Sequence, residues 1–185
     1  MSPMYSFKNF TDLTEQESDE VLQGRNDEEV RRWMTSDRRI TPDEHRRFMD
    51  SLKRNDKAIY VRIERAGCFS GVYSLNDIAD GSALGGFWVS AYTRQRFLAL
   101  NVVFQGMDYM FRTYGIDRIY GCQRADNHGA IRLNALLGLN RCGPSAGCGQ
   151  DMEQIEITRS QWEQNTARAP QLLKLMDRTE RLNPW

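Results

Sequence analysis

A change of hydrophobic period in the middle of the chain most limits how this sequence can fold. Three stretches, AIYVRIE (58–64), FSGVYSL (69–75) and LGGFWVS (84–90), have the alternation and composition of β-strands. Over residues 94–114 the apolar residues instead recur at helical spacing, and Gly115 follows where a helix often ends. A strand that leads into a long helix predicts a layered domain of sheet and helices.

Further elements flank this central part on both sides. Strands are predicted over 7–13, 116–122 and 152–158, and helices over 14–24, 28–34, 42–53, 126–138 and around 172–176. Thr41 and Glu44 have the spacing of a helix-capping box, and so do Ser160 and Glu163. We therefore expect an α/β (α+β) fold with a mixed central sheet.

The length of 185 residues suits one main domain. We expect that residues 1–160 form this domain and that residues 161–185 form a C-terminal helical extension packed on it. The extension either covers the sheet or mediates a homodimer.

Composition excludes several functions. The 25 Lys and Arg balance the 25 Asp and Glu, so we expect neither a nucleic-acid nor a membrane partner. No apolar run reaches the roughly 20 residues of a membrane-spanning helix, and the N-terminus lacks a secretory signal pattern, so the expected location is cytoplasmic. The four cysteines have no CxxC spacing and the two histidines lie far apart, so no metal is expected.

One candidate site is the strand–helix junction FWVSAYTRQRFLAL (87–100). Free N–H groups at a helix start can bind an anion, and Arg94 and Arg96 add positive charge there. The junction is either a pyrophosphate cradle or an ordinary connection with solvated arginines.

Two other stretches allow similar alternatives. In ADNHGAIRLNALLGL (125–139), Asn127 can cap a helix with no further role. Arg25, Trp33 and His45 could form a polar and aromatic pocket wall; alternatively, Trp33 belongs to the core and His45 is exposed.

Six segments, in this order, resemble the Gcn5-related N-acetyltransferase (GNAT) superfamily. They are FKNFTDLTEQE, LQGRNDEEVRRWM, TPDEHRRFMDSL, FSGVYSL, LGGFWVS and IYGCQRADNHGAIRL. In particular, the chain looks like the enzymes that N-acetylate a UDP-linked 4-amino-4,6-dideoxy sugar on the route to pseudaminic acid.

This resemblance implies a site for acetyl-CoA as co-substrate. The fourth and fifth strands would splay apart, and the pantetheine arm would enter the gap and pair with the fourth strand. The pyrophosphate would lie at the start of the next helix. The implied cofactor-binding residues are Phe87, Trp88, Val89, Arg94, Gln95, Arg96, Phe97, Leu98, Ala99 and Asn127.

The resemblance also implies an acceptor site. Arg25 and His45 match residues that hold a nucleotide sugar, and Trp88 matches an aromatic residue that lines the site. With Trp33, these are the implied substrate-binding residues.

Two positions depart from the family pattern. Phe97 replaces the first glycine of the phosphate loop, so its ring would turn into the core or obstruct the diphosphate. Asn134 stands where the family commonly has a tyrosine that protonates the departing thiolate. The candidate catalytic residues are Asn134, Tyr73 and Ser74, with Cys122 as a further substitute.

These features predict an enzyme, an acyl-CoA-dependent N-acetyltransferase that acts on a small acceptor. The leading candidate for this acceptor is an amino sugar nucleotide. The amine would attack the thioester directly, and backbone N–H near Val89 would hold the oxyanion. Two alternatives stay open. One is a GNAT-fold enzyme with a carrier-protein thioester donor, or an amino acid or protein amine as acceptor. The other is a GNAT-like subunit that binds without catalysing.

Overall fold

The computed structural model describes residues 4–144, 151–168, 174–176, 178, 179 and 182. Its strands are β1 (Tyr5–Asn9), β2 (Ile59–Arg65), β3 (Cys68–Ala79), β4 (Ser82–Val89), β5 (Arg118–Arg124), β6 (Asn140–Pro144) and β7 (Met152–Thr158). Its helices are η1 (Phe10–Asp12), α1 (Glu15–Asn26), α2 (Glu28–Arg31), α3 (Pro42–Leu52), α4 (Ala91–Gln95), α5 (Ala99–Thr113), α6 (His128–Leu136) and α7 (Arg159–Arg168).

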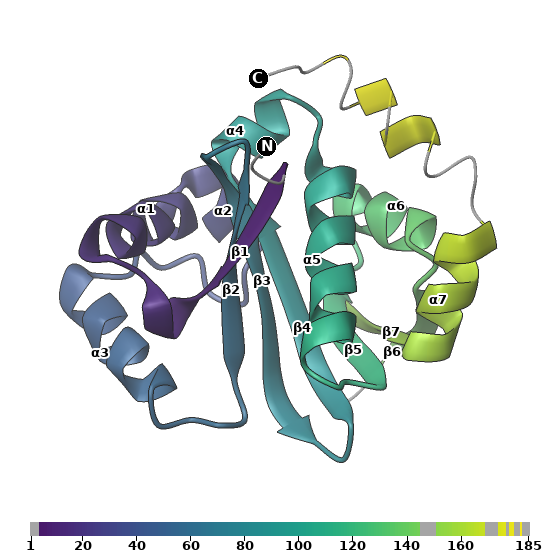
Figure 1. Cartoon of the computed structure of the whole chain (residues 1–185), viewed down its shortest axis with the longest axis horizontal. Coiled ribbons are helices and arrows are strands. Elements are labelled where there is room, and N and C mark those ends of the chain that lie inside the picture. The colour runs from purple at the N-terminus through teal and green to yellow at the C-terminus, as the bar shows by residue number, and fades with distance from the viewer. Residues whose placement is uncertain (1–3, 145–150, 169–173, 177, 180–181, 183–185) are drawn as a thin grey trace.

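The described strands form one mixed seven-stranded sheet in the order β1-β2-β3-β4-β5-β7-β6. Figure 1 shows α1, α2 and α3 on one side of the sheet, and α5, α6 and α7 on the other. The expected mixed α/β architecture is therefore confirmed. Within the described ranges, no helix combines the length and the apolar character that a bilayer crossing requires.

Capping boxes set where two of the helices begin. At α1, the Thr14 hydroxyl accepts from the Glu17 backbone N–H, and the Glu17 carboxylate accepts from the Thr14 N–H at 2.7 Å. Thr41 and Glu44 form the same box at α3, as predicted. These boxes satisfy N–H groups that the helix itself leaves unpaired.

The capping box predicted for α7 is wrong, because the observed box lies two residues earlier in the sequence. The Gln161 side chain accepts from the Thr158 N–H at 2.9 Å, and the Gln161 N–H donates to Thr158 Oγ1 at 3.3 Å. Helix α7 therefore begins at Arg159, before the predicted pair Ser160 and Glu163.

The predicted helix over 94–114 is also wrong in one respect, because it is two helices. Phe97 has a positive φ of 56°, which ends α4, and α5 begins at Ala99. The Leu98 N–H donates to the Thr93 carbonyl at 3.0 Å and the Phe97 N–H to the Arg94 carbonyl at 3.1 Å. This pair of bonds is a Schellman motif with phenylalanine in the position that glycine usually holds.

Other elements also differ from the sequence prediction. The strand predicted over 7–13 ends at Asn9, whose side chain caps the short helix η1. Strand β6 was not predicted. Of the helix predicted around 172–176, residues 172 and 173 lie outside the described residues.

Two hydrophobic clusters lie against the sheet. The larger cluster joins α5 to the strands and includes Leu75, Met107 and Met110. The smaller cluster includes Phe10 and Val21 and continues toward Trp88. Partly buried residues of β4 pack against both clusters, Phe87 and Val89 against the larger and Trp88 against the smaller, although only part of β4 pairs with β5.

The central strands β4 and β5 pair over only three residues. Their parallel register runs from Ser82↔Arg118 to Leu84↔Tyr120. Beyond this point β5 stays paired with β7 as far as Arg124, whereas β4 follows β3. The fourth and fifth strands therefore splay apart, as predicted.

Candidate functional site

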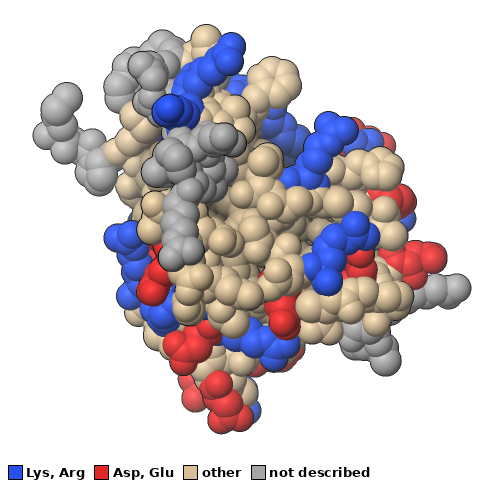
Figure 2. Space-filling view, turned by 90° about the vertical axis from the view of Figure 1, so that its right-hand side faces the viewer, with Lys and Arg blue, Asp and Glu red and all other residues tan. Residues whose placement is uncertain are grey.

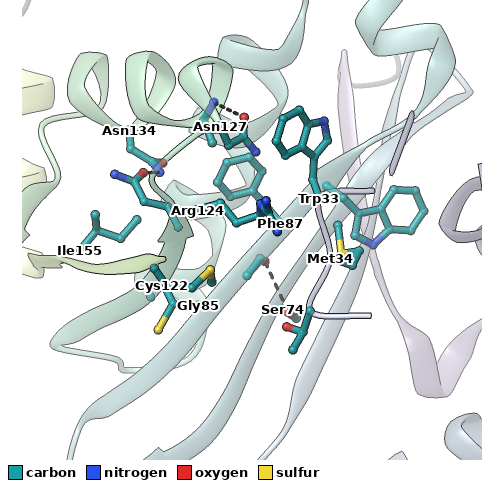
Figure 3. A pocket seen from close by; sticks show the side chains of 17 residues that line it. Trp33, Met34, Ser74, Gly85, Phe87, Cys122, Arg124, Asn127, Asn134 and Ile155 are labelled. Atoms are coloured by element: carbon teal, nitrogen blue, oxygen red, sulfur yellow. Dashed lines mark hydrogen bonds between the residues drawn. The ribbon is translucent and has the colours of Figure 1, made fainter. Parts of the chain in front are cut away.

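A cavity of about 490 Å³ lies where β4 and β5 separate. Figure 3 shows its side chains, which come from β3, β4, β5, α6, β7 and the segment after α2. It brings together seven predicted residues: Trp33, Ser74, Phe87, Trp88, Cys122, Asn127 and Asn134. It also includes residues that were not predicted, among them Met34, Thr35, Gln123, Met152 and Ile155.

Glycines form the point at which the two strands separate. A side chain at Gly85 would overlap Ile119 Cγ2, and a Cβ at Gly121 would lie 3.1 Å from the Gly85 carbonyl oxygen. Gly86 is less restricted, because a Cβ there would meet only Ser74 Oγ, at 3.1 Å. The strands can therefore approach closely at Gly85 and leave open space beyond it.

Helix α6 presents one polar line to the cavity. Asn127, Ala130 and Asn134 are three and four residues apart, which places them on one helix face, and all three line the cavity. Asn127 Oδ1 accepts from the Ala130 N–H at 3.1 Å and caps the helix. The capping role is therefore confirmed, and the Asn127 amide nitrogen is the group left for a ligand.

A chain of polar side chains runs behind Asn134. Asn134 Nδ2 donates to Gln123 Oε1 at 2.8 Å, and Gln123 Nε2 donates to Glu153 Oε1 at 2.6 Å. Arg141 donates through Nε and Nη2 to Glu153 Oε2, at 2.9 and 2.7 Å. These bonds from Arg141 lower the pKa of Glu153, although burial acts in the opposite direction. Asn134 is 3% exposed, and its Oδ1 has no hydrogen-bond partner in the described part of the chain.

The sequence did contain a signal for this row of hydrogen-bonded side chains. Glu153 has the same phase as the buried residues Ile155 and Ile157 in the alternating strand β7. It also faces Gln123 across the antiparallel β5–β7 pair. A carboxylate at a core-facing position requires a partner, which makes it a candidate for a site.

Trp88 separates this cavity from a second one of about 230 Å³. Its ring meets Phe69 edge-on, with centroids 5.6 Å apart. Gly24 of α1 lies against both rings, since a Cβ there would be only 3.0 Å from Trp88 and from Phe69. The second cavity brings Arg25 and His45 together with Trp88, whereas Trp33 lies on the first cavity.

Arg25 and His45 give the second cavity its polar groups among aromatic neighbours. Arg25 Nη1 is buried and has no hydrogen-bond partner among the described residues. Burial, and secondarily the charge of Arg31, lowers the pKa of Arg25. His45 is 7% exposed, its Nε2 lies 2.9 Å from Ser18 Oγ, and burial lowers its pKa.

The predicted phosphate loop does not line either cavity, and its two arginines differ in their contacts. Arg94 donates to the Val89 carbonyl at 2.8 Å and pairs with Asp27 at 2.5 Å. Burial would raise the pKa of Asp27, but the bonds from the Glu29 N–H and Arg94 outweigh it and lower that pKa. Arg96 stacks over Tyr92 at 4.3 Å.

The rest of the loop has unequal burial. Leu98 is fully buried, whereas Gln95 is exposed and the Phe97 side chain is 84% exposed. The expectation that the Phe97 ring would turn into the core is therefore wrong. Ala99 is the first residue of α5, and its N-cap Leu98 makes no side-chain capping bond.

Tyr73 and Ser74 lie on opposite faces of β3. Tyr73 is 2% exposed within the core, and burial raises the pKa of its phenol, so we do not retain it as a catalytic candidate. Ser74 faces the cavity, where its Oγ donates to the Gly86 carbonyl at 3.3 Å, and Cys122 also lines it. Among the described residues, no group of three His, Cys, Asp or Glu side chains is placed to hold a metal ion.

Comparison with known proteins gives one family match. The family profile described as acetyltransferase (GNAT) domain matches residues 9–140. Among curated proteins, none matches the sequence.

Solved structures include several with a similar fold. The N-acetyltransferase PseH of Campylobacter jejuni is 16% identical, with a TM-score of 0.67 over 85% of this chain and 99% of PseH. The spermidine N-acetyltransferase of Vibrio cholerae, in complex with CoA and spermine, is 16% identical, with a TM-score of 0.75 over 86% of this chain and 98% of that one. The ribosomal-protein-S5-alanine acetyltransferase of Vibrio fischeri is 15% identical, with a TM-score of 0.68 over 88% and 97%. At these identities the similarity concerns the fold alone.

Proposed function

Because the chain belongs to the acetyltransferase (GNAT) domain family, we propose that it transfers an acetyl group from acetyl-CoA to the amine of a small, negatively charged acceptor. The observation that carries this proposal is the cavity between the diverging strands β4 and β5, which adjoins a second cavity across Trp88. The first cavity suits a narrow thioester arm. The second suits an anionic acceptor because it contains Arg25.

The edge of β4 beyond Leu84 supports the position of the thioester arm. The Ser90 N–H donates to the Ser70 carbonyl of β3, so alternate residues Phe87 and Val89 direct their N–H and C=O groups to the other edge. No described strand pairs with that edge there. We propose that the pantetheine amides pair with the N–H and C=O groups of Phe87, while Asn127 Nδ2 donates from α6.

The start of α5 supports a position for the diphosphate. Because its N-cap Leu98 supplies no side-chain bond, the first N–H groups of the helix, including that of Ala99, can receive an anion. Arg96 adds a positive charge nearby, whereas Arg94 is committed to Asp27. The Phe97 ring points to solvent, so it would flank the diphosphate.

The half-buried Arg25 supports an anionic acceptor. Its Nη1 is buried and lacks a partner among the described residues, and burying part of a cation without a counter-charge is unfavourable. A phosphate or carboxylate would supply that charge, whereas a polyamine would add to the repulsion. An amino sugar nucleotide is therefore the first candidate, and an amino acid is the second.

The proposed reaction is a direct transfer. The neutral amine attacks the thioester carbonyl, a C–N bond forms, the C–S bond breaks, and the amine proton passes to solvent. The Val89 N–H would hold the oxyanion, and the Arg94 bond to the Val89 carbonyl fixes that end of β4. General acid catalysis is worth about 10²–10⁴-fold, so a thiolate that leaves unaided predicts slow turnover.

Calorimetry and a thiol-release assay test this proposal. We expect binding heat with acetyl-CoA, and faster thiol release with a UDP-amino sugar than with spermidine. Arg25→Ala should raise the KM for the acceptor about 10-fold without changing the Kd for acetyl-CoA. Arg47→Ala, a change at an exposed residue of α3, is the matched control.

Three results would overturn parts of the proposal. Absence of binding heat would remove acetyl-CoA as donor and favour a carrier-protein thioester. Preference for spermidine would remove the anionic acceptor. Binding of acetyl-CoA without acetylation of any amine would favour a non-catalytic binding subunit.

A further inference from the structure

We propose that Asn134 is held as a hydrogen-bond acceptor for an N–H group of a bound substrate, and that Gln123 and Glu153 are the positioning residues that hold it. This inference rests on the proposed function, because the contact lies inside the same cavity. The N–H group is an amide of the pantetheine arm or the amine of the acceptor.

The argument starts at Glu153, which is 8% exposed. Two hydrogen bonds from Arg141, at 2.9 and 2.7 Å, stabilise its carboxylate. An ionised carboxylate only accepts hydrogen bonds. Any group that meets its other oxygen must therefore be a donor.

That requirement fixes the orientation of the Gln123 side-chain amide, and through it that of Asn134. Gln123 must direct Nε2 to Glu153, at 2.6 Å, so its Oε1 faces Asn134. Asn134 must then direct Nδ2 to Gln123 Oε1, at 2.8 Å. Turning either amide would bring two oxygens together, so the charge at Glu153 determines which atom Asn134 has free.

The free atom is Asn134 Oδ1. It is buried, it has no partner among the described residues, and Asn134 lines the cavity opposite β4. A buried oxygen in this state is unfavourable until a donor arrives. The pantetheine arm and the acceptor are the two proposed ligands that carry N–H groups.

The same geometry explains the absence of a proton donor at this position. An amide does not release a proton in the physiological pH range, and here its oxygen is the unpaired atom. Asn134 therefore contributes to binding and orientation, and the thiolate leaves without its help.

Three variants test the inference at about pH 8, where Glu153 is ionised. Asn134→Leu removes the acceptor at similar size. Glu153→Gln replaces the carboxylate by an amide that can donate, which frees Gln123 and Asn134 to turn. Glu156→Gln is the matched control, because it makes the same change on the opposite face of β7, where Glu156 pairs with Arg118. The Kd for CoA and the KM and kcat for the amine are measured for each.

We expect Asn134→Leu and Glu153→Gln to weaken the same ligand by about 3- to 10-fold, and Glu156→Gln to change it less than twofold. A weaker Kd for CoA assigns the contact to pantetheine, and a higher KM for the amine assigns it to the acceptor.

The inference is overturned if Asn134→Leu leaves both constants unchanged. It is also overturned if Glu153→Gln binds like wild type while Asn134→Leu does not. Thermal unfolding midpoints identify variants that have lost the fold. Wild-type protein that binds no CoA would instead contradict the proposed function, which separates the two failures.

Discussion

At the scale of single residues, Phe97 is the clearest conflict between local and functional demands. Its φ of 56° belongs to the left-handed region, and its side chain is 84% exposed. The residue thus gains little from burial while its backbone is strained. Such a combination on the protein surface supports the proposal that the ring flanks a bound diphosphate.

Phe97→Gly should stabilise the protein. Removing the strain raises the free energy of unfolding by about 1–2 kcal/mol. The greater conformational freedom of glycine in the unfolded state lowers it by about 0.5–1 kcal/mol. The expected net gain in the free energy of unfolding is about 0.5–1 kcal/mol, measured in urea. Phe97→Ala, which keeps the strain, is the control, and an equal gain in both variants would show that the ring causes the instability.

Removing Arg94 and removing Arg96 should affect different properties, the first the stability of the fold and the second the binding of acetyl-CoA. Arg94→Ala breaks the part-buried pair with Asp27 and the bond to the Val89 carbonyl, so it should lower the free energy of unfolding by about 1–2 kcal/mol. Arg96→Ala should leave stability nearly unchanged and weaken acetyl-CoA binding by about 3- to 10-fold, more at low salt. Equal loss of acetyl-CoA affinity in both variants would contradict the division of roles.

At the scale of elements, the glycines of β4 control how the sheet opens. Gly85→Ala should force β4 away from Ile119 and cost about 1–3 kcal/mol, as overpacking does. Gly86→Ala should cost less than about 1 kcal/mol, because the Ser74 hydroxyl can rotate away. Urea unfolding of the two variants compares them directly. Equal costs would show that the separation of the strands does not depend on Gly85.

Elements defined by local signals were predictable from the sequence, and those defined by distant contacts were not. Thr41 with Glu44 and the strands of the central sheet rest on neighbouring residues. The division of the helix over 94–114 was missed because phenylalanine gives no signal for a left-handed residue. Asn127 and Asn134 were predicted from a resemblance, whereas the cavity glycines were not predicted. The Glu153–Gln123 contact depends on the pairing of β5 with β7.

At the scale of the whole molecule, the C-terminal residues support the proposal of one domain with an extension packed on it. Trp162 is 2% exposed and stacks near Phe104 and Phe111 of α5. Asn101 Nδ2 of α5 donates to the Met176 carbonyl at 3.0 Å. The expected homodimer and cytoplasmic location stay predictions.

Charge on the molecular surface is mixed, which suits a protein with no net charge. Figure 2 shows basic and acidic side chains interspersed on the face that it displays.

Lys8 and the Thr14 N–H hold the pKa of Glu17 at about 2. Since this pKa is depressed, its contribution to stability is present above pH 4.5 and is lost as the pH falls toward 2.

His45 should add a separate loss of stability at milder acidity. Burial lowers the pKa of His45 below 6.5, while Ser18 and the charge of Asp19 oppose this effect. The unfolded chain therefore binds a proton more readily than the folded one, so stability falls as the pH drops through 6.5 and levels off below the folded pKa.

Unfolding in urea at about pH 7.5 and about pH 5.5 isolates this effect, because the depressed carboxylates titrate below that interval. We expect wild type to lose stability between the two pH values and His45→Gln, which can still accept from Ser18, to lose less. An anionic ligand near Arg25 would favour the protonated imidazole, so a saturating acceptor should reduce the wild-type loss. Equal losses in wild type and His45→Gln would show that the pKa of His45 is the same in the folded and unfolded states, so that burial does not lower it.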